Sequence, residues 1–106
     1  MAVVFVSVNK TFESSMTIDE LATAAYRAWP LTLAKAKDMT HLVAVREGKP
    51  LMAWNVLDAY ATDETYETNG GPRPRVGFVL GSPVPLRPAW FDVPDLRRGI
   101  AYDRNR

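Results

Sequence analysis

The sequence predicts an α+β domain with a small, curved or barrel-like mixed β-sheet and one or two N-terminal helices. Three observations lead to this prediction. A β-branched run at residues 3–8 predicts a strand, and helix signals follow at residues 17–29. Residues 41–57 then form two hydrophobic runs around Gly48-Lys49-Pro50, which is typical of a hairpin. Regular alternation of strands and helices is absent, which disfavours a doubly wound fold.

Length and composition predict a single domain over residues 1–106. The chain is 47% hydrophobic and 24% charged, as globular proteins are, and its net charge is +1. It contains no cysteine, which excludes disulfides, thiolate metal sites and cysteine nucleophiles and favours a reducing compartment. No apolar run reaches membrane-spanning length, and the N-terminus lacks the features of a signal peptide. We therefore expect a cytoplasmic protein with no membrane partner.

The N-terminal half supplies a strand and the helices. The run at residues 3–8 is dense enough in β-branched side chains for a strand buried on both faces. Thr17 and Glu20 form a capping box, which begins a helix that Pro30 ends. Residues 31–37 could alternate as a strand, but their alanines and lysines favour a short second helix.

The C-terminal half predicts less regular structure. Residues 58–74 combine acids, threonines, glycines and prolines, the composition of a long exposed loop. Residues 75–80 predict a strand, and the proline-rich residues 83–91 an extended tail. A helical turn over residues 93–98 and a last strand over 100–102 complete the expected order.

Three segments carry a resemblance to a known family. They are Tyr-Arg-Ala-Trp-Pro-Leu at residues 26–31, Val-Ala-Val-Arg-Glu-Gly-Lys-Pro at 43–50, and Arg-Val-Gly-Phe-Val-Leu-Gly at 75–81. Over residues 18–81 the chain resembles the small PUA-like domains, which include the ASCH and EVE domains. The resemblance implies a small β-barrel with a cleft that accepts RNA or a modified or flipped base. The first strand lacks the tryptophan usual in EVE domains.

Aromatic and basic side chains are the candidate ligand-binding residues. Trp29, Trp54 and Tyr66 could stack on bases, and Arg73 with Arg75 could meet phosphate. For Trp54 a place in the core is the favoured interpretation, because a small barrel needs bulky side chains. The first hypothesis is a non-enzymatic binding domain for a nucleotide, a nucleobase or a short RNA or DNA, in a cleft beside the first helix.

A protein-interaction or inhibitory module is the alternative hypothesis. Trp90 and Phe91 lie among prolines in the tail, where exposed aromatic side chains would anchor a protein partner or a homodimer.

Catalysis has little support in the sequence. The single histidine, His41, opens a strand and has no nucleophile assigned to it by spacing, so an edge or capping role is favoured. Asp58, Asp63 and Glu64 could serve a metal-dependent hydrolase or nuclease, but their spacing matches no metal loop. No P-loop, dinucleotide fingerprint or nucleophile elbow is present. We assign no catalytic residue, no metal and no cofactor.

Overall fold

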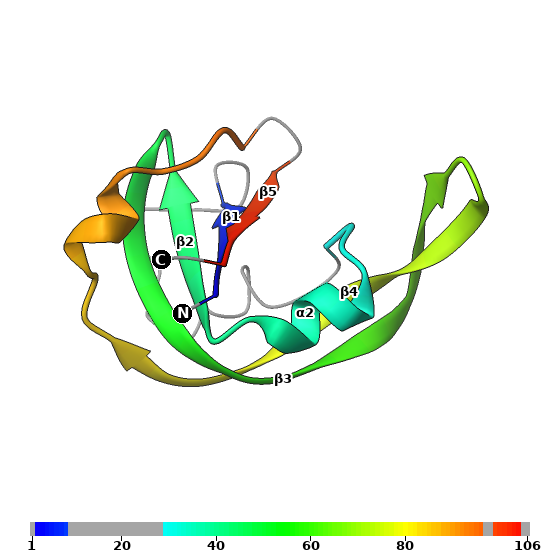
Figure 1. Ribbon diagram of the computed structural model, residues 1–106, viewed down its shortest axis with the longest axis horizontal. Helices are drawn as coiled ribbons and strands as arrows, with labels where there is room; N and C mark the ends of the chain where they lie inside the picture. Colours follow the sequence, from blue (N-terminus) through cyan, green and yellow to red (C-terminus); the bar gives the residue numbers. More distant parts are fainter. Residues whose placement is uncertain (1, 9–28, 97–98, 105–106) are drawn as a thin grey trace.

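Over the residues that the structure describes, the fold is a five-stranded mixed β-sheet with little helix (Figure 1). The computed structural model describes residues 2–8, 29–96 and 99–104. The strands are β1 Val3–Ser7, β2 His41–Arg46, β3 Lys49–Thr68, β4 Gly71–Val84 and β5 Ile100–Asp103. Their order is β4-β3-β2-β1-β5; β1 and β2 are parallel and the other neighbours antiparallel. The mixed sheet is confirmed. In the described part of the chain no pairing joins β4 to β5, so the sheet is open rather than closed into a barrel.

Both faces of the sheet are buried at its centre. Val4 and Val6 point to one face, which α2 covers, whereas Val3 and Phe5 point to the other, which the tail residues 84–96 cover. We call these the helix face and the tail face. The prediction that the first strand is buried on both faces is confirmed, because the side chains of residues 3–6 are fully buried in the two cores.

The short second helix is confirmed as α2, Leu33–Asp38, where Thr32 caps the N-terminus by accepting the Lys35 N–H at 3.3 Å. The predicted first helix lies outside the described residues except for its last position, Trp29. There the chain is not helical, as expected for the residue that precedes Pro30. Trp29 is extended and exchanges two backbone hydrogen bonds of 2.9 Å with Val76, consistent with the bias against helical geometry before proline.

The first hairpin is confirmed, but its turn is Glu47-Gly48 rather than Gly48-Lys49-Pro50. Glu47 and Gly48 both have positive φ, 50° and 77°, as in the tight turns whose twist matches that of the flanking strands. Pro50 lies inside β3, opposite Val45.

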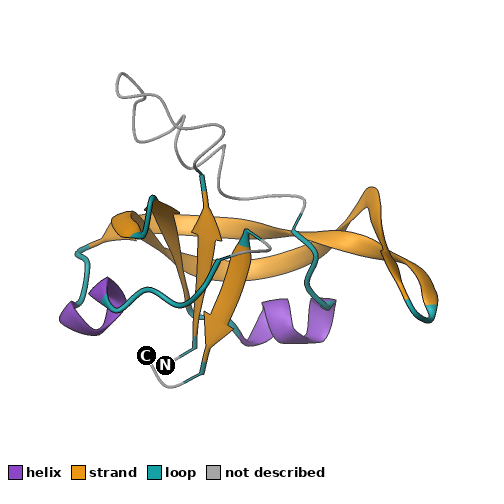
Figure 2. Cartoon of the chain, turned by 90° about the horizontal axis from the view of Figure 1, so that it is seen from above, coloured by secondary structure: helices purple, strands orange, loops and turns teal. Residues whose placement is uncertain are grey.

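The predicted loop over residues 58–74 is wrong, because most of it is strand. β3 continues to Thr68 and β4 begins at Gly71, so residues 58–68 and 71–79 form a two-stranded ribbon, here called the arm. Tyrosines and threonines favour the extended conformation, and Gly71, with φ 101°, follows the turn. Figures 1 and 2 show the arm extending away from the remaining strands. The strand predicted at 75–80 is therefore the middle of a longer one.

The tail crosses the sheet on the face opposite α2. Its helical turn is a 3-10 helix, η1 Pro88–Phe91, and residues 93–96 are not helical, so the turn predicted at 93–98 is wrong over the part described. The last strand is confirmed as β5. None of the helices in the described part of the chain has the length and apolar character needed to cross a membrane.

Candidate functional site

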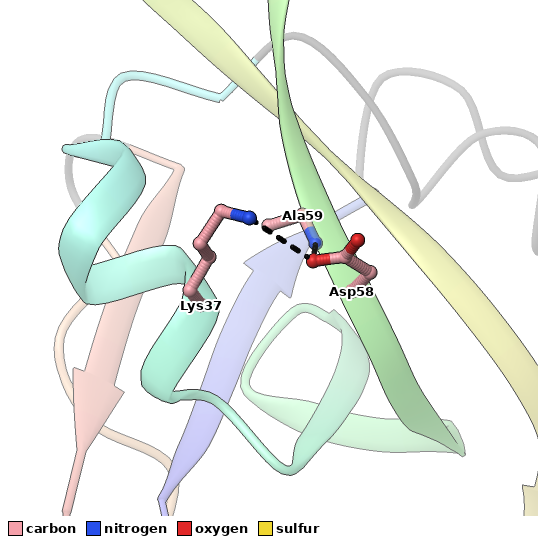
Figure 3. A network of polar contacts seen from close by, with 3 residues as sticks. All are labelled: Lys37, Asp58 and Ala59. Atoms are coloured by element: carbon pink, nitrogen blue, oxygen red, sulfur yellow. Dashed lines mark hydrogen bonds and ion pairs between the residues drawn. The ribbon is translucent and has the colours of Figure 1, made fainter.

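The root of the arm is fixed where β3 leaves β2. Asn55 is the last β3 residue in register with β2. Beyond it, β4 is the only described strand that pairs with β3. At this point the Asp58 carboxylate accepts the Ala59 N–H at 2.8 Å and the Lys37 ammonium at 3.4 Å (Figure 3). These two contacts, the backbone bond first, lower the pKa of Asp58. The network joins α2 to the base of the arm.

One side of the arm gathers the aromatic and basic residues. On β4, Val76 and Phe78 point into the helix-face core. Because side chains alternate along a strand, the residues between and beside them lie on the opposite side. Cross-strand partners share a side, which adds two tyrosines of β3. This side, here called the outer face, consists of Asp58, Tyr60, Tyr66, Arg73, Arg75, Gly77 and Val79, with Asp58 at its root end opposite Val79.

Tyr66 and the two arginines are neighbours at the distal end of the outer face. Tyr66 stands directly opposite Arg73 in the register, and the Arg75 guanidinium carbon lies 6.0 Å from the centre of the Tyr66 ring. Arg75 is positioned further because its Nε donates to the Thr65 carbonyl at 3.3 Å. Arg73 is exposed and pairs with no carboxylate in the described part of the chain. An aromatic ring and two guanidinium groups therefore share one small surface.

Tyr60 occupies the root end of the outer face. It stands opposite Gly77, and a Cβ at position 77 would lie 2.5 Å from the Tyr60 Cζ atom. The ring therefore lies over the glycine, yet Tyr60 remains 38% exposed. Val79 beside it is also exposed.

Acidic side chains on the arm counteract the positive charge of its two arginines. The arm carries Asp58, Asp63, Glu64 and Glu67 against Arg73 and Arg75. Glu67 stands opposite Pro72, so it lies on the side away from the outer face. A register shift places residues 62–64 opposite Arg75 alone, in a bulge of β3. Glu67 is thus separated from the arginines by side, whereas Asp58 shares their face at the root of the arm, and the arm as a whole is acidic.

Neither edge of the arm is suited to accepting another strand. Three prolines remove N–H donors from β4, namely Pro72, Pro74 and Pro83. Trp29 already occupies the hydrogen-bonding groups of Val76. The free edge of β3 is interrupted by the bulge at residues 62–64 and is acidic. The arm therefore presents faces rather than edges to a ligand.

The structure brings together three of the five predicted ligand-binding residues, Tyr66, Arg73 and Arg75. Trp54 is 2% exposed within the helix-face core, which confirms the favoured interpretation of it as a core residue. Trp29 is half-buried against the same core and its ring lies near Gly99, away from the outer face.

The two predicted partner-binding residues behave differently. Trp90 is 0% exposed, so the prediction of an exposed anchor there is wrong. The tail folds back onto the sheet because this ring completes the tail-face core with Val43 and Ala53. Phe91 is 59% exposed and borders a cavity of about 370 Å³ between the β2–β3 turn and the tail.

Sequence reasoning missed Tyr60 as part of the site. A glycine inside a strand pattern, here Gly77, signals close approach of another group, and this signal could have pointed to a ring packed across it. The residues considered for catalysis do not converge. In the described part of the chain no three His, Asp or Glu side chains form a group that could hold a metal ion. His41 contacts Trp90 at 5.3 Å between ring centres.

Comparison with family models, with curated proteins and with solved structures finds no match for this chain.

Proposed function

We propose that the protein is a non-enzymatic, PUA-like nucleic-acid-binding domain that holds its ligand on the outer face of the arm. The observation that supports this proposal is the convergence of Tyr66, Arg73 and Arg75, with Arg75 placed 6.0 Å from the ring centre of Tyr66. An aromatic ring offers a stacking surface to any base, and guanidinium groups attract phosphate. The mixed sheet is compatible with a small mixed β fold, and the PUA-like part of the proposal rests on the sequence resemblance.

The charge of the arm sets the expected character of binding. Two arginines provide about two phosphate contacts, and each contact contributes roughly −0.7 to −0.9 to the slope of log affinity against log salt. We therefore expect a shallow slope of about −1.4 to −1.8. The four carboxylates of the arm oppose binding, so the affinity should be modest and best seen at low salt.

The test is a fluorescence-anisotropy titration of labelled mixed-sequence oligonucleotides at several salt concentrations. Arg73→Ala should weaken binding at low salt and make the slope shallower by about 0.7–0.9, because one phosphate contact is lost. Lys49→Ala is the matched control, since it removes one positive charge from an exposed position at the first hairpin turn. The proposal fails if the protein binds no oligonucleotide at low salt, or if both variants weaken binding equally.

A further inference from the structure

Resting on the proposed function, we infer that the ligand is a single-stranded nucleic acid that lies along the outer face with unpaired bases against Tyr66 and Tyr60. The inference is carried by the spacing of the two rings, by the place of Glu67 on the opposite side of the arm and by the exposure of Tyr60.

The rings of Tyr66 and Tyr60 lie near the two ends of the outer face. Tyr66 stands opposite Arg73, and Tyr60 stands opposite Gly77. Gly77 lies four residue steps along the extended strand from Arg73, which is about 13 Å at about 3.3 Å per step. Arg75 lies between them on the same side. The order along the arm is thus ring and arginine, arginine, ring, which suits a chain of bases and phosphates laid parallel to the ribbon.

The acidic side chains disfavour a duplex. A β-ribbon inserted in a groove of double-stranded DNA has phosphates on both sides, and the duplex carries one negative charge per about 1.7 Å. If the arm were inserted in such a groove, Glu67 would face one row of phosphates, because it lies on the side away from the outer face. Residues 62–64, with their two carboxylates, would also stand close to phosphate. A single strand on the outer face meets the arginines and avoids Glu67, and Asp58, which shares that face at the root of the arm, already pairs with Lys37.

Base stacking also favours a single strand over a duplex as the ligand. The bases of a duplex are already stacked on each other, so their faces are closed to a protein ring, whereas each unpaired base offers a free face. Tyr60 packs over Gly77 and keeps 38% of its surface exposed, so the ring is held in place and still accessible. The outer face is therefore suited to bases that have no pairing partner.

The experiment compares a labelled 15-nucleotide strand with the same strand annealed to its complement, as DNA and as RNA, by fluorescence anisotropy at low salt. The single strand should bind at least tenfold more tightly than the duplex. Tyr60→Ala and Tyr66→Ala should each weaken single-strand binding about fivefold and change duplex binding little. Tyr60→Phe should retain binding, because it keeps the aromatic ring that packs on Gly77.

Tyr102→Ala is the matched control, because Tyr102 is 37% exposed, close to Tyr60 in exposure, but lies on β5. Duplex binding equal to or tighter than single-strand binding, with sensitivity to Arg73→Ala retained, overturns this inference and leaves the proposed function standing. Absence of binding to either form overturns both.

Discussion

The ring of Tyr60 lies over the backbone of Gly77, so that a Cβ at position 77 would stand 2.5 Å from the Tyr60 Cζ atom. The pair is directly opposed in the β3–β4 register. A cross-strand aromatic ring over a glycine covers backbone that would otherwise face solvent, and it stabilises a ribbon that consists of only two strands. The arrangement explains why a glycine is tolerated in the middle of β4.

Gly77→Ala should displace Tyr60 from the arm. Alanine favours the strand more than glycine does, but its methyl group requires the ring to move, so we expect a net loss of stability of about 1 kcal/mol. In a Tyr60→Ala background the same substitution should be neutral or stabilising. Urea unfolding of the four proteins in this double-mutant cycle measures the coupling, and an identical cost in both backgrounds would rule the contact out.

Trp90→Ala should be among the most damaging single substitutions in the described part of the chain. The ring is 0% exposed in the tail-face core, and its removal should lower the free energy of unfolding by about 3–5 kcal/mol. Phe91→Ala, at a side chain that is 59% exposed, should change it by about 0.5 kcal/mol or less. Chemical denaturation gives both values. If Trp90→Ala does not fold, Trp90→Phe replaces it, and a cost no larger than that of Phe91→Ala contradicts the burial.

Stability should fall as the pH drops below about 6.5 because of His41. Burial first, and then the charge of Arg87, lower the pKa of His41 from its ordinary value of 6.5. A depressed histidine pKa means that the unfolded chain binds more protons than the folded one, so the contribution is complete above pH 6.5 and declines as the pH falls toward the folded-state pKa. Unfolding midpoints between about pH 5 and 8 should show this decline.

His41→Gln should flatten the dependence over the same interval, because it removes the titrating group. A pH profile that stays unchanged in His41→Gln would assign the effect to other residues.

The elements with a strong local pattern could be predicted from the sequence. The β-branched run predicted β1, the alanines and lysines of residues 31–37 predicted α2, and the paired hydrophobic runs predicted β2 and the start of β3. The extent of β3 and β4 could not be predicted, because acids, prolines and glycines in residues 58–74 match loop composition as well as an exposed ribbon. In a ribbon with solvent on one side, the partner strand decides the conformation.

The candidate site was predictable only in part. Tyr66, Arg73 and Arg75 were identified by residue type, but their meeting on one side depends on the register of the arm. For Trp90, by contrast, the sequence context led to a wrong prediction. Prolines around an aromatic residue suggested exposure, whereas the tail returns to the sheet and buries the ring in a second core. Tertiary packing, which local composition does not encode, determined both outcomes.

The most direct test of the account compares Tyr66→Ala with Glu67→Ala in oligonucleotide binding at low salt. The two residues are adjacent on β3 and lie on opposite sides of the arm, so only the first belongs to the outer face. Tyr66→Ala should weaken binding of a single-stranded oligonucleotide at least about fivefold, since one stacking contact is worth about 1–3 kcal/mol. Glu67→Ala should leave binding unchanged or slightly tighter, because it removes a negative charge. Equal weakening by the two variants, or weakening by Glu67→Ala alone, would contradict a nucleic-acid site on the outer face.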